Sequence, residues 1–423
     1  MVSVGVLIDL PWRSDSGGHV KCWERFAQAA LALPERLDLT LYFLGDRSGQ
    51  TVIGPTVRYC FQPPRWGTDR LPFLHNIADH TDLAPFHPAL AAQLQHHDVL
   101  HATHQLFSFG KTALRLSQRQ QIPLVASIHT DVPYYTEIYT QTILQQMLGD
   151  RGLGGALYHS LIHSLQFPQR RRTAMEQQIQ HYCRSCRHVW TSHAQDHHKI
   201  SLSVSPDRHS HLRRGIDKTL FHPQRRDRRW LQHTYGIAPE IPVTLFVGRL
   251  NACKNVILAA QTLRRLREQS LDVKGIFVGK GPLKAEIQEI LGENAIFPGQ
   301  LAPVDLAPLY ASADLFLFPS TTEVYGNVVL EARASGLAVA ITDQGGVGQF
   351  LGRSGQDGLC IPELTAEAWA ATLGPWLQQP DRLRALGTLA QHQVHTTWPS
   401  WQDVLEEDLL PVWQRYASPA GGR

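Results

Sequence analysis

The chain has 423 residues, of which 43% are hydrophobic and 18% charged, a balance typical of globular proteins and unlike that of disordered chains. This length exceeds what one core usually needs and suits two domains of about 200 residues each. The net charge is only +3, so the overall charge gives no reason to expect nucleic acid or another polyanion as a partner.

The apolar runs of the sequence are short. The longest, such as residues 243–248 and 315–319, have the length of a buried strand, far below the ~20 residues that a membrane span needs. The first residues lack a basic region followed by a long apolar stretch, so they do not resemble a signal peptide. We therefore expect a cytoplasmic protein whose sequence starts with a strand.

The six cysteines are scattered, and only Cys183 and Cys186 lie close together, as a C-x-x-C pair. A zinc ribbon would need a second pair at fixed spacing, and a redox motif would need a thioredoxin-like setting; neither is evident. We favour two structural thiols over a metal or redox site. Cysteines without a disulfide framework suit a reducing cytoplasm.

Short β-branched or aromatic runs alternate with longer helical patterns along the whole chain, which predicts an α/β protein with parallel sheets covered by helices. The predicted strands are residues 4–10, 39–45, 98–102, 123–129 and 188–192 in the first half and 243–249, 274–279, 295–299, 315–320 and 337–342 in the second. Residues 255–269 and 303–312 are predicted helices.

The strand–helix pattern restarts near Pro242, as though a second sheet begins there. A polar, basic stretch with prolines and a glycine precedes it, which is typical of a boundary between domains. We predict two doubly wound domains, residues 1–205 and 230–395, a linker over 206–229, and a final segment, 396–423. Ligands of such sheets bind beyond the carboxyl ends of the strands, which predicts a cleft between the domains.

Residues 319–336 follow a predicted strand and carry two glutamates eight positions apart, Glu323 and Glu331. Gly326 between them would begin a helix, where backbone N–H groups attract phosphate and the missing side chain lets a ligand approach. One carboxylate can accept both hydroxyls of a ribose, because it offers two acceptor oxygens. The alternative is a solvated pair of surface glutamates.

Two cations lie at the end of the strand predicted at 243–249: Arg249 is its last residue, and Lys254 follows five positions later. Fixed positive charges at this place suit a diphosphate whose charge must be stabilised as it leaves. Ordinary loop cations are the alternative. Residues 277–282 form another strand and glycine turn, but they lack the third glycine of the dinucleotide fingerprint.

In the first half, Gly17 and Gly18 lie between the first strand and a helix, where backbone amides can bind a phosphate or a sugar. His129 ends another predicted strand and could hydrogen-bond a sugar hydroxyl or polarise the reacting centre. Because the chain has 22 histidines, its position alone distinguishes it.

With these residues in place, the sequence resembles the retaining glycosyltransferases of the GT-B fold that use nucleotide sugars, the glycosyltransferases group 1. The resemblance runs in order over nearly the whole chain, and the E-x7-E segment carries it most specifically. The matching segments are residues 16–27, 98–105, 122–131, 213–223, 247–255, 277–282, 315–336 and 342–346. Residues 397–416 look like the last helix of that fold, which returns to the N-terminal domain.

The resemblance implies a role for each matching residue of the second half. Arg249 and Lys254 would bind the diphosphate, Glu323 would lie at the donor sugar, and Glu331 would hold the ribose. The remaining donor-binding positions would be Gly326, Asn327 and Val328.

In the first half, the resemblance places His129 on the acceptor side and the loop of Gly17 and Gly18 between donor phosphate and acceptor. These enzymes need neither a catalytic metal nor another cofactor, and the sequence has no clear Asp-x-Asp motif. Two positions depart from the family pattern. Arg333 replaces a small or apolar residue, which we interpret as a surface contact, and Gln349 stands where a glutamate is frequent.

The resemblance implies transfer of a hexose, with a UDP-sugar favoured over GDP-mannose, to a lipid or glycan acceptor. Residues 128–140 are similar to family members that glycosylate lipids, and basic residues prevail from Arg151 to Arg214. An anionic membrane surface at the inner face is therefore a candidate partner, although a core helix followed by a solvated basic face explains the pattern slightly better. The alternatives are a sugar-nucleotide epimerase of the same fold and a non-catalytic subunit that binds nucleotide sugars.

Overall fold

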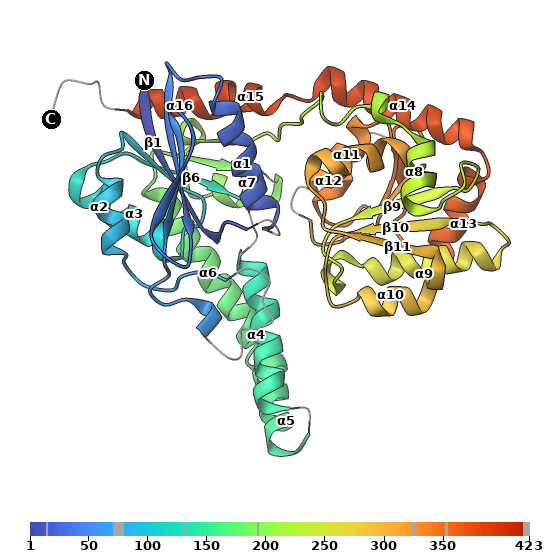
Figure 1. The fold of residues 1–423 in the computed structure, drawn as a ribbon. Helices are drawn as coiled ribbons and strands as arrows, with labels where there is room; N and C mark the ends of the chain where they lie inside the picture. The colour runs from blue at the N-terminus through green and yellow to red at the C-terminus, as the bar shows by residue number, and fades with distance from the viewer. Residues whose placement is uncertain are drawn as a thin grey trace. The chain divides into compact units, whose positions relative to one another are not determined.

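A computed structural model of the chain describes residues 1–13, 16–70, 80–129, 132–149, 151–192, 194–323, 326–351 and 354–417. The chain divides into two compact units, each with its own sheet (Figure 1). The N-terminal unit comprises Met1–Arg213 and Trp401–Arg423, and the C-terminal unit comprises Arg214–Ser400.

The described residues of the N-terminal unit form an eight-stranded sheet in the order β3-β4-β2-β1-β5-β6-β7-β8. All neighbours are parallel except β3 and β4, which are antiparallel. The bounds are β1 Val2–Pro11, β2 Leu37–Leu44, β3 Gly49–Gly54, β4 Val57–Gln62, β5 Val99–Ala102, β6 Leu124–Ile128, β7 His188–Thr191 and β8 His209–His211. The central strands are buried along their length, as expected for parallel strands covered on both faces.

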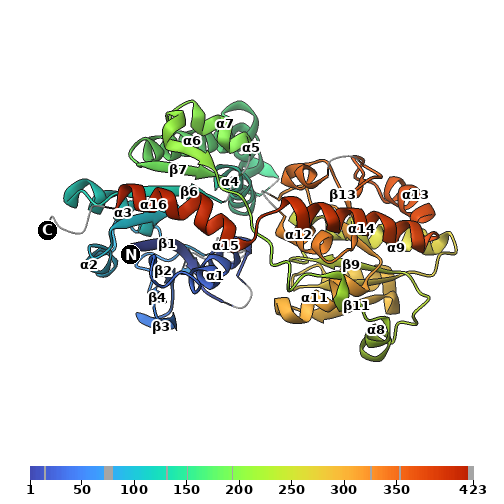
Figure 2. The same ribbon diagram turned by 90° about the horizontal axis from the view of Figure 1, so that it is seen from above.

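Helices cover this sheet, and the last two come from the C-terminal end of the chain (Figure 2). Leu405, Leu409 and Trp413 share a hydrophobic core with Trp23 and Phe26 of α1. The helices are α1 Gly18–Ala30, α2 Pro88–Leu94, α3 Ser108–Gln120, α4 Val132–Leu148, α5 Gly152–His159, α6 Phe167–Arg184, α7 Ala194–Ser201, α15 Trp401–Val404 and α16 Leu410–Tyr416.

The C-terminal unit contains a parallel sheet of six strands, in the order β11-β10-β9-β12-β13-β14. The strands are β9 Val243–Val247, β10 Lys274–Val278, β11 Ala295–Gly299, β12 Leu315–Phe318, β13 Ala338–Ile341 and β14 Leu359–Cys360. The helices are α8 Arg228–Tyr235, α9 Val256–Glu268, α10 Lys284–Leu291, α11 Pro303–Ser312, α12 Asn327–Ala334, α13 Ala366–Leu377 and α14 Pro380–Thr397.

Two doubly wound α/β sheets therefore confirm the predicted fold class. The strand order reverses between β1 and β5 in one sheet and between β9 and β12 in the other, and in such sheets ligands bind at this point. Every predicted strand is present, whereas β3, β4, β8 and β14 were not predicted. The last two are only three and two residues long, too short for a period-2 pattern. No helix within the described ranges is long and apolar enough to cross a bilayer.

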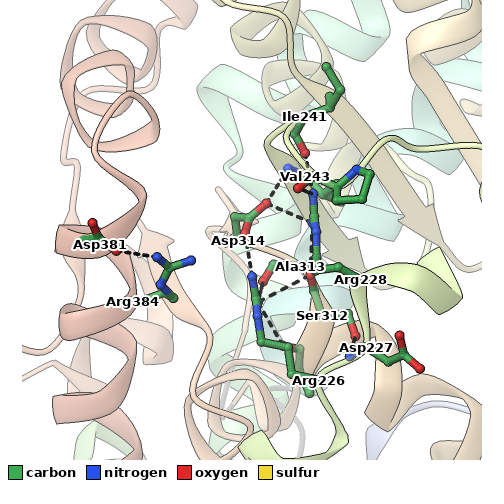
Figure 3. Close-up of polar contacts among 12 residues, drawn as sticks. Arg226, Asp227, Arg228, Ile241, Val243, Ser312, Ala313, Asp314, Asp381 and Arg384 are labelled. Carbon is green, nitrogen blue, oxygen red and sulfur yellow. Dashed lines mark hydrogen bonds and ion pairs between the residues drawn. The ribbon is translucent and has the colours of Figure 1, made fainter. Parts of the chain in front are cut away.

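The stretch predicted as a linker, residues 206–229, is divided between the two units. Its first part supplies β8, and two of its later arginines, Arg226 and Arg228, bind other segments of the C-terminal unit (Figure 3). Arg228 donates to Asp314 Oδ2 at 3.1 Å and to the carbonyl of Ile241 at 2.6 Å. Arg226 donates to the carbonyl of Ala313 at 3.1 Å. These arginines satisfy carbonyls at the end of α11 that have no partner within the helix, which explains why a polar, basic segment is structural here.

Several histidines of the N-terminal unit are buried and held neutral. Burial lowers the pKa of His97, His104 and His188 to about 4 and that of His101 to about 3. Their partners are neutral: Tyr42 for His97, Ser127 for His101 and Ser210 for His188. These rings are therefore part of the core of the unit.

The arginine network predicts a difference between two aspartates that both pair with arginine. Asp314→Ala should lower the free energy of unfolding by about 2–4 kcal/mol, because Arg226 and Arg228 lose their carboxylate in a partly buried setting. Asp381→Ala is the matched control, since the side chains of Asp381 and Arg384 are 92% and 57% exposed. Urea titration of the full chain measures both. Equal losses in the two variants would contradict a structural role for Asp314.

The buried histidines predict loss of stability in mild acid. Their pKa values lie below the value of about 6.5 expected in the unfolded chain, so the unfolded state binds more protons below that pH. The contribution of these rings is complete above pH 6.5 and falls as the pH drops toward about 4, by about 1.4 kcal/mol per pH unit for each histidine. Urea titrations between pH 7.5 and 4.5 should show this slope. His101→Gln should reduce it and exposed His96→Gln should leave it unchanged.

Candidate functional site

In the C-terminal unit, the loops after β9 and β12 meet beside each other. Lys254 lies at the end of a short 3₁₀ turn after β9, and its ammonium donates a hydrogen bond to Glu323 Oε1 in the loop after β12. Each of these side chains is 18% exposed, so the pair is partly shielded from water and open to a ligand. Arg249 is half-buried two residues beyond β9. The fold thus brings together Lys254 and Glu323, which the sequence predicted to act at one site.

Backbone bonds fix the position of this pair. Thr322 Oγ1 donates to the carbonyl of Cys253 at 2.8 Å, which connects the loop of Glu323 to that of Lys254. The N–H of Gly346, after β13, donates to the carbonyl of Glu323 at 2.6 Å. Three strand ends therefore share one bonded set of loops.

Close packing of the backbone explains why Gly279 and Gly281, after β10, are glycines. A Cβ on Gly279 would lie 2.0 Å from the carbonyl oxygen of Gly248, and one on Gly281 would lie 2.2 Å from that of Leu250. The N–H of Leu250 donates to the carbonyl of Lys280 at 2.9 Å. This glycine turn therefore packs directly against the loop that carries Arg249, which a turn with side chains could not do.

Helix α12 begins at Asn327, as predicted, with Gly326 as its N-cap at φ 60°. A Cβ on Gly326 would lie 2.6 Å from Cγ1 of Val347, so the protein itself requires glycine here. Asn327 and Val328, in the first turn, are half-buried. The amide oxygen of Asn327 and the hydroxyl of Ser320 are buried with no partner among the described residues. Buried polar atoms are usually hydrogen-bonded, so each of these two atoms has capacity for a further hydrogen bond.

Glu331 is oriented by a tyrosine that the sequence did not indicate. The hydroxyl of Tyr310, on α11, donates to Glu331 Oε2 at 3.1 Å. Tyr310 is fully buried, and burial together with the charge of Glu331 raises its pKa well above the ordinary value of 10. The tyrosine therefore stays a donor over the physiological pH range. It lies in a helix of mainly apolar residues, where no pattern distinguishes it from a core side chain.

The interpretation of Arg333 as a surface contact is wrong. Its side chain is fully buried and donates to Asp357 Oδ2 at 3.2 Å and to Gln393 on α14. A buried guanidinium needs such partners, because an unpaired charge in the core is costly. Arg333 thus fixes α12, the helix of Glu331, against α14. The side chain of Gln349 lies outside the described residues.

In the N-terminal unit, Gly17 and Gly18 begin α1, as predicted. Gly17 is the N-cap, in an extended conformation, and a Cβ on Gly18 would have no atom within 4 Å. The backbone here is open to a ligand. His129 follows β6, is 6% exposed, and its Nε2 lies 2.7 Å from Ser127 Oγ.

Ser127 connects His129 to a second histidine, since its Oγ also lies 2.8 Å from His101 Nε2. His19, in the first turn of α1, stacks on His129 with ring centroids 4.5 Å apart, and His104 lies at the same distance from His19. The structure thus surrounds the predicted His129 with His19, His101 and His104, which sequence reasoning passed over because each is one of many histidines.

The surroundings of the cysteine pair favour two structural thiols over a metal or redox site. Cys183 and Cys186 are fully buried, and burial raises the pKa of Cys183 to about 12 and that of Cys186 well above its ordinary value. Such thiols are unreactive. Within the residues that the structure describes, no group of three histidine, cysteine or acidic side chains could hold a metal ion.

Comparison with known proteins agrees with the predicted family. The sequence model of the glycosyl transferases group 1 matches residues 241–379. The sulfoquinovosyl transferase SQD2 of Arabidopsis thaliana is 28% identical over 257 residues, 59% of this chain and 43% of its own length. The D-inositol 3-phosphate glycosyltransferase of Nocardia farcinica is 32% identical over 226 residues, 49% of this chain and 48% of its own length. The match spans less than half the length of each of these relatives.

The fold is similar to solved structures over nearly the whole chain. The Anabaena protein HepE, crystallised in complex with UDP and glucose, superposes with a TM-score of 0.63 at 17% identity, covering 96% of this chain and 98% of that one. This likeness establishes the GT-B fold. Residues 241–379, the part of the chain that the family model matches, are thus similar to the glycosyl transferases group 1, in agreement with the predicted family.

Proposed function

We propose that this protein is a retaining glycosyltransferase that moves a hexose from a nucleoside-diphosphate sugar, with a UDP-sugar favoured, to a lipid or glycan acceptor. The observation that carries the proposal is the Lys254–Glu323 pair at the carboxyl ends of β9 and β12, beside the start of α12. A cation, a helix N-terminus and a carboxylate in this arrangement suit a diphosphate joined to a sugar.

In the proposed complex, Arg249 and Lys254 bind the diphosphate, and Glu323 accepts a hydrogen bond from the donor sugar. Lys254 then serves both groups, because its ammonium has three donors and Glu323 uses one of them. Glu331 binds the ribose hydroxyls, with Tyr310 holding one of its oxygens in place. The carboxylate is thereby oriented before the ligand arrives, which reduces the entropy lost on binding.

In the proposed reaction, the bond between the anomeric carbon and the β-phosphate oxygen breaks, and the acceptor oxygen attacks from the same face. The acceptor proton passes to the departing phosphate. Negative charge grows on that phosphate in the transition state, so the two cations and the amides of α12 stabilise the transition state more than the bound donor. No metal or other cofactor takes part in this proposal.

We place His129 on the acceptor side, with the open backbone at Gly17 and Gly18 as a contact for donor or acceptor. The Ser127 hydroxyl beside His129 Nε2 fixes the orientation of the ring. His101 lies on the other side of that hydroxyl. Burial lowers its pKa to about 3, so the His101 ring is uncharged at neutral pH.

The relatives support the choice of substrates. The two sequence relatives are a sulfoquinovosyl transferase and a D-inositol 3-phosphate glycosyltransferase. The structural relative was crystallised with UDP and glucose. Thermal-shift screening of UDP-, GDP- and ADP-sugars would identify the donor, because a tight ligand raises the apparent stability by mass action.

Lys254→Ala and Glu331→Ala should each weaken nucleotide-sugar binding by about 2–4 kcal/mol, a rise in Kd of about 30- to 1,000-fold, because each removes a charge-assisted contact. Exposed Glu293→Ala is the matched control and should bind as the unchanged protein does. Titration calorimetry with the donor that the screen identifies measures the effect. Unchanged affinity in both site variants would refute the proposed donor site.

Slow release of sugar from labelled donor without acceptor distinguishes a transferase from a binding subunit, because only a catalyst transfers the sugar to water. Loss of that release in Lys254→Ala, with the fold intact by circular dichroism, is the expected result. No release from the unchanged protein with any donor that binds would favour a non-catalytic subunit.

Ser127→Ala should lower kcat by about tenfold, the scale of one lost hydrogen bond at a reacting group, and leave the KM for the donor unchanged. The matched control is Ser210→Ala, which removes the same kind of bond from His188 in the same sheet. Steady-state kinetics measures both variants. Equal changes in the two variants would mean that the bond of Ser127 only stabilises the sheet.

A further inference from the structure

A helical arm made of α4, α5 and α6 extends from the N-terminal unit (Figure 1). Near the sheet, α4 and α6 are held together by polar contacts. Arg172 donates to Glu137 at 3.0 Å and lies 3.5 Å from Glu176, and Thr136 Oγ1 donates to Met175 Sδ at 2.9 Å. The arm is thus connected across its two long helices, and α5 lies at its far end (Figure 1).

The outer part of the arm, residues 147–167, exposes large apolar side chains, and we call it the apolar tip. Leu153 is 93% exposed and Met147 is 70% exposed. Leu157, one helical turn from Leu153 on α5, is 50% exposed, and Leu165 and Phe167 are 45% and 40% exposed. Single exposed leucines are ordinary, but this many in 21 consecutive residues mark an interaction surface.

Most of the charged residues around the apolar tip are positive. Between residues 138 and 175 the sequence has four arginines, Arg151 and Arg170–Arg172, and one acidic residue, Asp150. Arg151, Arg170 and Arg171 are exposed and form no ion pair with any residue in the described ranges. Arg172 is paired with Glu137 and Glu176, so those flanking acids do not offset the exposed charge.

We propose that the apolar tip binds the surface of an anionic lipid bilayer. The exposed leucines and Met147 would enter the boundary between headgroups and acyl chains, and the arginines would bind lipid phosphates. The inference rests on the proposed function in one respect: a lipid acceptor would be met at that surface.

Charge favours a bilayer over a second copy of this chain. Two apolar tips in contact would bring their arginines together with few acidic side chains to pair with, which is repulsive. Anionic lipid supplies both an apolar interior and negative phosphates. Residues 147–167 therefore suit a membrane surface better than they suit each other.

The test is co-sedimentation of the full chain with vesicles of phosphatidylcholine, with and without phosphatidylglycerol. The unchanged protein should bind the anionic vesicles and release them at high salt. The double variant Leu153→Ser/Leu157→Ser should lose at least about tenfold in affinity, because two exposed leucines no longer enter the bilayer. Arg170→Gln/Arg171→Gln should lose about tenfold or more, with a weaker dependence on salt. Leu389→Ser, at a leucine that is 57% exposed on α14 of the C-terminal unit, is the matched control and should bind normally.

Binding that the leucine variant leaves unchanged, or equal binding to neutral vesicles, would overturn the proposal. So would a dimer of the unchanged protein that the leucine variant abolishes in sedimentation velocity. Two variants distinguish failure of this membrane proposal from failure of the proposed function. Lys254→Ala should still bind anionic vesicles, and the leucine variant should still release sugar from the labelled donor in solution.

Discussion

The parallel pairing of β9 with β12 is the constraint on which the candidate site depends. It brings the carboxyl ends of two strands that are about 70 residues apart in sequence to one edge of the sheet, so the loops that follow must share the same space. Lys254 and Glu323 meet there as an ion pair, and the glycines of the turn after β10 allow a third strand end to approach. A break in this pairing would separate the two charges, whatever their identity.

Buried polar side chains transmit that constraint to the rest of the C-terminal unit. Tyr310 orients Glu331 from α11, and Arg333 joins the same helix to Asp357 and Gln393. Each is fully buried, so each depends on its partner to offset the loss of water. Helix α12 is therefore held from two sides. This rigidity suits the proposed complex, in which the N-terminus of the helix and its carboxylate would bind different parts of one ligand.

The N-terminal unit uses histidine in a different way. Where the C-terminal unit joins charges, this unit buries imidazole rings that bond to hydroxyls, as in the His101–Ser127–His129 series, in which burial holds His101 neutral. Such rings pack like aromatic residues and still offer a polar atom at the end of β6. The helical arm extends from the same unit, and its apolar tip adds a surface that packing inside the unit does not explain.

Local patterns in the sequence determined ten of the fourteen described strands, the α/β class and the loops on which Arg249, Lys254, Glu323 and Gly326 lie, because apolar runs and glycines act within a few residues. Their direct pairings and the partners Tyr310 and Ser127 were decided only by the tertiary structure. The same is true of the basic stretch at residues 206–229: its composition indicated a linker, but Asp314 and the carbonyls at the end of α11, which bind Arg226 and Arg228, come from a segment 80 or more residues away. Contacts between distant segments depend on sheet order and helix packing, which no short pattern encodes.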